Sequence, residues 1–88
     1  MSDIVIYSSR LCPFCYRAAA LLRRKGFTFR EINVDMKPAL RAEMRGKAGG
    51  RNTVPQIFIN ERHIGGCDEL YALDGQGGLD AIVNQNTA

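Results

Sequence analysis

A dithiol placed between an apolar strand and a helix is the feature that most constrains how this chain can fold. Residues 4–7 form a short apolar run that is typical of a buried strand. After a polar turn, the segment Cys-Pro-Phe-Cys at residues 12–15 leads into a run rich in Ala and Leu, which predicts a helix over residues 13–25. A further apolar run over residues 27–34 predicts a βαβ unit with parallel strands and a right-handed crossover.

The position of the dithiol favours a reactive thiol at Cys12. Pro13 suits the first helical position, where its missing N–H costs nothing. The Cys12 sulfur is then expected among unpaired backbone N–H groups at the positive end of the helix dipole, which favours the thiolate. Cys15 lies one helical turn further on, within disulfide reach, and is expected to be more buried and less acidic. The pair predicts dithiol–disulfide exchange, with Cys12 as the nucleophile and Cys15 as the resolving thiol.

The rest of the chain predicts a small α/β domain in the order βαβ-α-ββ-α. Pro38 opens a second short helix with an apolar face, and residues 46–52 predict a loop because they are rich in Gly. Residues 56–59 and 62–64 predict an antiparallel hairpin. The expectations for the C-terminal part are a tight turn at Gly65-Gly66, a helix capped by Asp68, a break over residues 75–78, a helical piece over residues 79–83 and a fraying end over residues 84–88.

Length and composition narrow the class of protein. The 88 residues predict a single domain over residues 1–88 with a limited core. Three cysteines are too few for a secreted scaffold held together by disulfides, and an odd number cannot all pair within one chain. With no visible signal peptide or membrane span, a cytoplasmic protein in a reducing compartment is expected. The net charge of +3 comes from scattered basic residues without interleaved aromatic residues, so nucleic-acid binding is not expected and a small anionic ligand fits better.

Three sequence blocks in this order resemble the glutaredoxins of the dithiol, class I type found in bacteria. They are the Cys-Pro-Phe-Cys segment, Thr-Val-Pro-Gln-Ile-Phe-Ile at residues 53–59 and His-Ile-Gly-Gly-Cys-Asp-Glu-Leu at residues 63–70. The resemblance covers nearly all of residues 3–83. It implies a thioredoxin-like fold, in which helices flank a four-stranded mixed sheet. It also implies a monomeric, glutathione-dependent oxidoreductase that reduces protein disulfides and glutathione–protein mixed disulfides, with glutathione as co-substrate and no tightly bound cofactor.

The resemblance also assigns the residues of a glutathione site. It implies a cis Val54–Pro55 bond that faces the dithiol, with Val54 offering its backbone to the cysteinyl part of glutathione. The turn before Asp68 is expected to bind the γ-glutamyl end, with backbone N–H groups on its carboxylate and the Asp68 carboxylate on its ammonium. Cys67 is interpreted mainly as a packing residue. The expected glutathione-binding residues are Arg10, Phe14, Arg51, Thr53, Val54, Pro55, Gly66, Cys67 and Asp68.

One position departs from the family pattern. Many glutaredoxins carry a Lys three residues before the nucleophile, where it pairs with the glycine carboxylate of glutathione, and this chain has Ser9 there. Either Arg10 supplies the charge from the neighbouring position, or Arg51 and Arg41 do. Phe14 replaces a common Tyr and is expected to form an aromatic wall without a hydroxyl.

Other functions for the same residues stay open at the level of the sequence. One alternative is a thioredoxin-like reductant that is served by thioredoxin reductase. A second is a glutathione-ligated iron–sulfur cluster between two subunits, which Pro13 after the nucleophile disfavours. A structural zinc site is not expected, because Cys12, Cys15, His63 and Cys67 do not have a zinc-finger spacing. An adaptor without redox chemistry finds no support while both dithiol cysteines are present. From this resemblance, the candidate protein partners are ribonucleotide reductase and other enzymes that form a catalytic disulfide.

Overall fold

Four strands form one mixed sheet in the computed structural model, which describes residues 3–84. The strand order is β2-β1-β3-β4, with β1 parallel to β2 and the other two pairs antiparallel. The elements in chain order are β1 (Ile4–Ser8), α1 (Pro13–Arg24), β2 (Arg30–Asn33), α2 (Pro38–Lys47), β3 (Gln56–Ile59), β4 (Arg62–Gly65), α3 (Cys67–Gly75) and α4 (Gly78–Asn84). The predicted order of elements, the parallel βαβ unit and the antiparallel hairpin are therefore confirmed.

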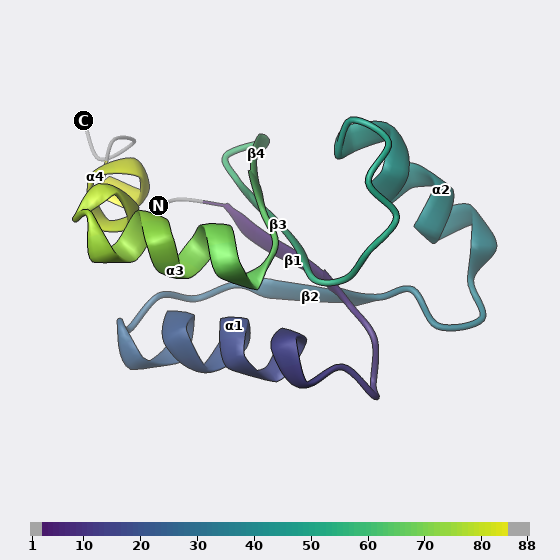
Figure 1. Cartoon of the computed structure of the whole chain (residues 1–88), viewed down its shortest axis with the longest axis horizontal. Helices are drawn as coiled ribbons and strands as arrows, with labels where there is room; N and C mark the ends of the chain where they lie inside the picture. The colour runs from purple at the N-terminus through teal and green to yellow at the C-terminus, as the bar shows by residue number, and fades with distance from the viewer. Residues whose placement is uncertain (1–2, 85–88) are drawn as a thin grey trace.

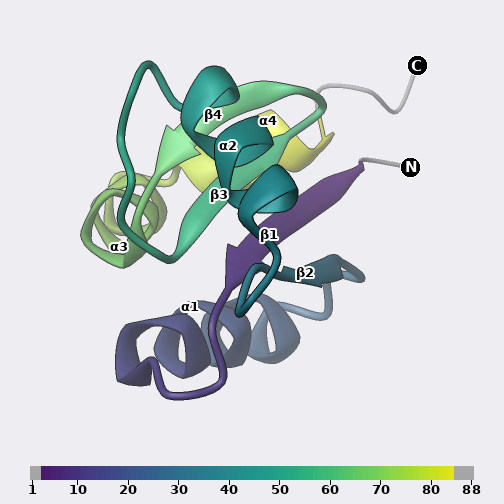
Figure 2. The same ribbon diagram turned by 90° about the vertical axis from the view of Figure 1, so that its right-hand side faces the viewer.

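The sheet separates two apolar clusters, because the side chains of each strand alternate between its faces. On one face, Ile6 and Ile57 pack with residues of α1, α3 and α4. On the other face, Tyr7 and Phe58 pack with Met44 of α2. Figure 1 shows α1 and α3 side by side with α2 set apart from them, and Figure 2 shows α1 and α2 on opposite sides of β1.

Helix α1 follows the sequence prediction closely and carries the dithiol into the structure. Pro13 is its first residue, and Ala18, Leu21 and Leu22 form its buried face as expected from their spacing. The helix ends at Arg24, one residue earlier than predicted. Gly26 follows with a φ of +78°, a conformation that favours glycine and reverses the chain.

Several sequence predictions about element boundaries, besides the end of α1, are wrong. Strand β2 covers only Arg30–Asn33, because Phe27 and Phe29 pack against the cluster under α1 and α3 instead of pairing with β1. The predicted loop over residues 46–52 begins later, since α2 continues to Lys47. Helix α3 is capped by Gly66 and not by Asp68, which lies inside its first turn. Of the predicted fraying end, residue 84 belongs to α4 and residues 85–88 lie outside the described residues.

Ion pairs fasten the C-terminal end of α1 to the last two helices. The Lys25 ammonium lies 2.7 Å from Asp74 Oδ1 of α3 and 2.9 Å from Asp80 Oδ2 of α4. These carboxylates raise the pKa of Lys25. The basic run at the end of α1 therefore does more than complement the helix dipole, because Lys25 connects three helices. Within residues 3–84, no helix has both the length and the apolar character needed to cross a membrane.

Candidate active site

The Cys12 sulfur lies at the N-terminus of α1, as the sequence predicts. Cys12 is the N-cap residue with an extended backbone, and its Sγ accepts a hydrogen bond from the Cys15 N–H at 3.1 Å. The same N–H also lies 3.1 Å from the Cys12 carbonyl oxygen, so the two acceptors of Cys12 share one donor in the first turn of the helix. A hydrogen bond from an amide and the positive end of the helix dipole both favour a negatively charged sulfur.

Cys15 has a different environment although it is only one turn away. Its side chain is 4% exposed, against 7% for Cys12. Burial raises the pKa of Cys15 to about 12, and the hydrogen bond with Cys12 acts in the same direction. Both cysteines are in the free thiol form. At neutral pH, Cys15 is therefore a protonated thiol.

The segment before β3 approaches the dithiol from the other side. The Val54–Pro55 peptide bond is cis, as the family resemblance implied, and the Val54 carbonyl oxygen lies 3.7 Å from Cys12 Sγ. This distance is in the range of a weak hydrogen bond from the thiol. It places the Val54 backbone directly beside the sulfur.

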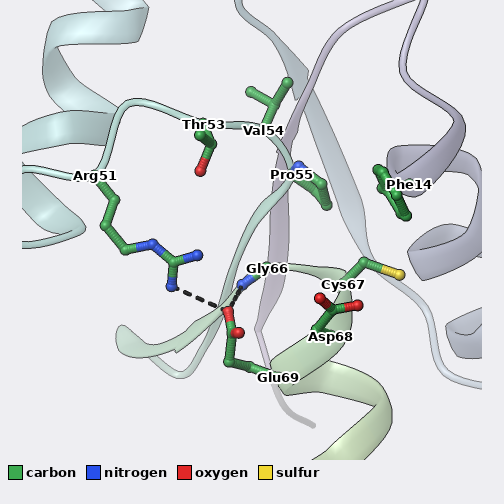
Figure 3. Close-up of a pocket in the computed structure, with 9 residues that line it drawn as sticks. All are labelled: Phe14, Arg51, Thr53, Val54, Pro55, Gly66, Cys67, Asp68 and Glu69. Carbon is green, nitrogen blue, oxygen red and sulfur yellow. Dashed lines mark hydrogen bonds and ion pairs between the residues drawn. The ribbon is translucent and has the colours of Figure 1, made fainter.

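A pocket of about 140 Å³ opens beside this segment. Figure 3 shows Arg51 on one side of it and Phe14 on the other, with the start of α3 between them. The lining residues are Phe14, Arg51, Thr53, Val54, Pro55, Gly66, Cys67, Asp68 and Glu69. The structure thus brings together eight of the nine residues expected for glutathione binding, with Glu69 as an addition and Arg10 outside the lining.

Glu69 ties two walls of this pocket together, and the sequence reasoning missed it. Its Oε1 accepts the Gly66 N–H at 2.6 Å and lies 3.0 Å from Arg51 Nη1 (Figure 3). These two hydrogen bonds lower the pKa of Glu69, with the Gly66 amide as the larger cause. Gly65 leaves the space for this contact, since a Cβ there would lie 2.5 Å from Glu69 Oε1. A Glu three residues after the N-cap is the signal of a capping box, but placing the cap at Asp68 hid it.

Asp68 and Phe14 present contrasting groups to the pocket. The Asp68 side chain is exposed, and within residues 3–84 its carboxylate has no hydrogen-bond or ion-pair partner. The Phe14 ring is 51% exposed, with the Arg17 guanidinium 5.9 Å from its centroid. An unpaired carboxylate can accept an ammonium group, and an exposed ring gives an apolar wall next to it.

The loop that carries Cys12 is held by Asp35, a second residue that the sequence reasoning did not single out. Asp35 Oδ1 accepts from the Ser9 hydroxyl at 2.6 Å, and its Oδ2 accepts from the Arg10 N–H at 2.9 Å. The Arg10 backbone bond, and then the Ser9 bond, lower the pKa of Asp35. Ser9, found where a Lys is common, thus binds within the protein. Sequence alone gives no signal for this contact, since it joins the ends of β1 and β2.

Of the basic residues considered for the missing charge, only Arg51 lines the pocket. The Arg10 side chain is exposed and lies outside the lining. Arg41 donates to Asn52, with 3.0 Å from Nε to Oδ1 and 2.6 Å from Nη2 to the carbonyl oxygen. Arg41 therefore supports the loop that leads to the pocket, and Arg51 is the cation that faces the cavity.

Cys67 lies at the start of α3 and packs within the cluster under α1. Its thiol is 6% exposed, and burial raises the pKa of Cys67. Both observations agree with its interpretation as a packing residue at the pocket wall. Within residues 3–84, no three His, Cys, Asp or Glu side chains are grouped so that they could hold a metal ion.

Comparisons with known proteins agree with this geometry. A sequence profile of the Glutaredoxin family matches residues 4–64. Glutaredoxin 3 of Escherichia coli (strain K12) is 54% identical over 83 residues, which cover 94% of this chain and 99% of the relative. The solution structure of a glutaredoxin from Brucella melitensis superposes with a TM-score of 0.81 at 54% identity, covering 92% of this chain and 87% of that one.

A more distant relative was solved with a ligand. The crystal structure of a buckwheat glutaredoxin–glutathione complex superposes with a TM-score of 0.87 at 29% identity, covering 96% of this chain and 78% of that one. The fold is therefore the thioredoxin-like fold that the sequence predicted. With a dithiol at the N-terminus of α1, a cis-proline segment beside it and these relatives, the chain belongs to the glutaredoxin family of thiol–disulfide oxidoreductases.

Proposed function

We propose that Cys12 is the nucleophile and that the pocket beside it binds glutathione. The observation that carries this proposal is the hydrogen bond from the Cys15 N–H to the Cys12 sulfur. The Cys12 thiolate attacks the glutathione sulfur of a protein–glutathione disulfide. A disulfide forms between Cys12 and glutathione, and the protein thiolate leaves and takes up a proton from water. A second glutathione thiolate then attacks this intermediate, which releases oxidised glutathione and regenerates the Cys12 thiolate.

The pocket offers a complementary group for each part of glutathione. The Val54 backbone beside Cys12 suits the peptide-like cysteinyl part, as an added strand would pair. The exposed Asp68 carboxylate and the N-terminus of α3 suit the ammonium and carboxylate of the γ-glutamyl end. Arg51 suits the glycine carboxylate, in exchange for its present partner Glu69. The buckwheat glutaredoxin of the same fold was solved in complex with glutathione, which supports this choice of ligand.

Protein disulfides follow a second route that needs both cysteines. Cys12 attacks the protein disulfide, and a mixed disulfide with the substrate protein forms as one protein thiolate leaves. Cys15, once deprotonated, attacks the Cys12 sulfur, so the substrate leaves as a dithiol and Cys12–Cys15 becomes a disulfide. Two glutathione molecules then reduce this disulfide. We further propose that the chain acts as a monomeric single domain in a reducing cytoplasm, with ribonucleotide reductase among the candidate partners.

A coupled assay separates this function from a thioredoxin-like alternative. We expect turnover of a glutathionylated peptide with glutathione, NADPH and glutathione reductase. We expect no turnover when thioredoxin reductase and NADPH are the sole source of electrons. Activity with thioredoxin reductase alone would contradict glutathione dependence, and Cys12→Ser is the control for uncatalysed exchange.

A further inference from the structure

A chain of hydrogen bonds runs from β4 to the segment that forms one wall of the pocket. Gln56, the first residue of β3, is fully buried. Its Nε2 donates to the Thr53 carbonyl oxygen at 3.0 Å and to the Thr53 hydroxyl at 3.2 Å. On its other side, its Oε1 lies 2.7 Å from His63 Nε2. Thr53 lines the pocket, whereas Gln56 and His63 do not.

The hydrogen-bond chemistry fixes the direction of this chain. A backbone carbonyl only accepts, so the Gln56 amide nitrogen must face Thr53 and its oxygen must face His63. His63 Nε2 must then carry a proton, which selects the Nε2–H tautomer of the neutral imidazole. Burial, and then the positive charge of Arg51, lower the pKa of His63, so the neutral ring prevails at pH 7.

Packing holds the imidazole in the orientation that this bond needs. His63 is the cross-strand partner of Phe58, so both side chains lie on the face of the sheet that α2 covers. The two rings are 5.0 Å apart between centroids and inclined by 33°. Gln56 shares this face, since it lies two residues before Phe58 on β3. Packing against Phe58 thus orients the His63 ring, and its hydrogen bond orients the buried Gln56 amide. The Gln56 amide in turn holds the Thr53 carbonyl by a hydrogen bond.

We propose that Gln56 and His63 are positioning residues that hold the segment from Thr53 to Pro55 in its glutathione-binding conformation. This inference rests on the proposed glutathione site and goes beyond it, because neither side chain touches the pocket. Because Gln56 is fully buried, a lost hydrogen-bond partner of its amide is costly to replace, so removing the His63 donor weakens the hold of the amide on Thr53. The expected consequence is weaker recognition of glutathione with unchanged reactivity of the Cys12 sulfur.

The test measures the equilibrium between Cys12 and oxidised glutathione in a Cys15→Ser background. The Cys12 thiolate and oxidised glutathione give the Cys12–glutathione disulfide and one glutathione thiolate, so pocket contacts with the bound glutathione raise the equilibrium constant. We expect His63→Phe to lower this constant about 2- to 12-fold, the change that corresponds to losing one neutral hydrogen bond. The Phe ring keeps the stacking on Phe58, and His63→Gln should restore the constant because it returns an N–H donor.

Two controls distinguish a specific loss of glutathione binding from a general disturbance of the fold or of Cys12. The same equilibrium with bis(2-hydroxyethyl) disulfide, which lacks the γ-glutamyl and glycine ends, should not change in His63→Phe. Arg62→Ala, an exposed change on the same strand, should leave both constants unchanged. Equal losses with both disulfides, or no loss with glutathione, would overturn the inference. If the Cys15→Ser parent shows no preference for glutathione over the small disulfide, the proposed glutathione site itself fails.

A spectroscopic readout tests the hydrogen-bond chain directly. Nitrogen-15 spectra of the imidazole at pH 7 should show a protonated Nε2 and an unprotonated Nδ1 at His63. Gln56→Met removes the acceptor and should abolish this tautomer preference, as well as lowering the glutathione equilibrium constant. The opposite tautomer in the parent protein would overturn the chain as described. Since Gln56 is buried, thermal unfolding of Gln56→Met accompanies the measurement, and the His63 variants decide the outcome if that variant does not fold.

Discussion

Cys12 and Cys15 are one helical turn apart and nearly equally buried, yet their surroundings assign them different chemistry. Cys12 Sγ accepts the amide hydrogen bond at the helix end, whereas burial raises the pKa of Cys15 to about 12. The first sulfur is therefore suited to attack, and the second is a protonated thiol at neutral pH because it is buried.

Mutation should distinguish the roles of the Cys12 and Cys15 thiols. We expect Cys12→Ser to abolish every exchange reaction, because it removes the nucleophile. Cys15→Ser should retain the reduction of glutathionylated peptides while it loses the reduction of protein disulfides, since only the second route needs a resolving thiol. Parallel assays with a glutathionylated peptide and a disulfide-containing protein check this expectation. Loss of both activities in Cys15→Ser would disprove the two-route mechanism.

Arg51 should contribute to glutathione binding through its charge. Arg51→Gln should raise the KM for the glutathionylated peptide about 3- to 10-fold with kcat nearly unchanged, as expected for one partly exposed charged contact. The effect should shrink at high ionic strength because salt screens the guanidinium. Arg62→Gln, which removes an exposed charge on β4 outside the pocket, is the matched control. An unchanged KM in Arg51→Gln would mean that another group binds the glycine end.

At the scale of elements, periodicity and local signals predicted most of the fold. The apolar runs of β1 and β3, the Pro13 start of α1 and the Gly26 stop all act within a few residues, so the sequence shows them directly. The predicted extent of β2 was wrong because its length depends on which residues reach β1. That pairing is a tertiary property that a short apolar run does not contain.

The same distinction separates the predicted from the missed residues of the site. The residues from Thr53 to Pro55 and from Gly66 to Asp68 could be assigned because they form contiguous motifs. Glu69 and Asp35 were missed since each acts through partners from another part of the chain, Arg51 in one case and the loop before Cys12 in the other. The contacts of Glu69 with Arg51 and of Asp35 with the loop leave no spacing pattern in a single sequence, whereas the bond from Gly66 to Glu69 has the capping-box spacing, which assignment of the cap to Asp68 concealed.

The ion pairs of Lys25 should stabilise the packing of α1 against α3 and α4. Lys25→Met keeps much of the aliphatic side chain but removes the charge between Asp74 and Asp80. We expect a lower midpoint of thermal unfolding, with a difference from the parent that decreases in high salt. Arg24→Met, on the exposed side of the same helix end, should change the midpoint less. Equal midpoints for Lys25→Met and the parent would show that these pairs add no stability.

At the scale of the whole molecule, large exposed apolar side chains gather near the dithiol. Among residues 3–84 the exposed large hydrophobic residues are Leu11, Phe14, Tyr16 and Met36, and the first three lie within four positions of Cys12. Leu11 is 95% exposed next to the nucleophile and lies outside the pocket lining. A substrate protein whose disulfide reaches Cys12 would contact this exposed apolar surface.

Substitution of Leu11 should therefore distinguish between substrates. We expect Leu11→Ser to lower kcat/KM for a disulfide-containing protein about 3- to 10-fold, since it removes an apolar side chain that a protein bound at Cys12 would contact. The reduction of a small glutathionylated peptide should stay the same. Met36→Ser is the comparison for an exposed apolar residue further along the chain. Equal losses with both substrates would contradict a role in protein docking.

The stability of the molecule should fall in acid. Backbone hydrogen bonds lower the pKa of Asp35 and Glu69, and burial lowers the pKa of His63. Each group then contributes stability above its unfolded pKa of about 4 for the carboxyl groups and about 6.5 for His63, and loses it as the pH falls through the folded value. Urea unfolding between pH 7 and pH 3 should show decreasing midpoints, with a shallower slope in Asp35→Asn. A constant midpoint over this range would contradict the prediction.

The reduced protein should also lose stability in alkali. Burial is the main cause that raises the pKa of Cys15, Cys67 and Tyr7, so the folded state keeps protons that the unfolded state releases. This contribution is complete below the ordinary thiol pKa of about 8.5 and is lost as the pH rises through the folded values. Urea midpoints of the reduced protein should decrease above about pH 8.5, and less steeply in Cys15→Ser.

The sheet and its two apolar clusters fix the distance between the two halves of the site. Helix α1, which carries the nucleophile, packs into one cluster, while Val54, which borders the pocket, packs against the other. Strands β1 and β3 contribute side chains to both clusters, so these strands determine how far the sulfur lies from the wall that would align its ligand. Loosening of one cluster would therefore misalign the two halves of the site before either half unfolds, and hydrogen exchange of the β1 and β3 amides would report how firmly that spacing is kept.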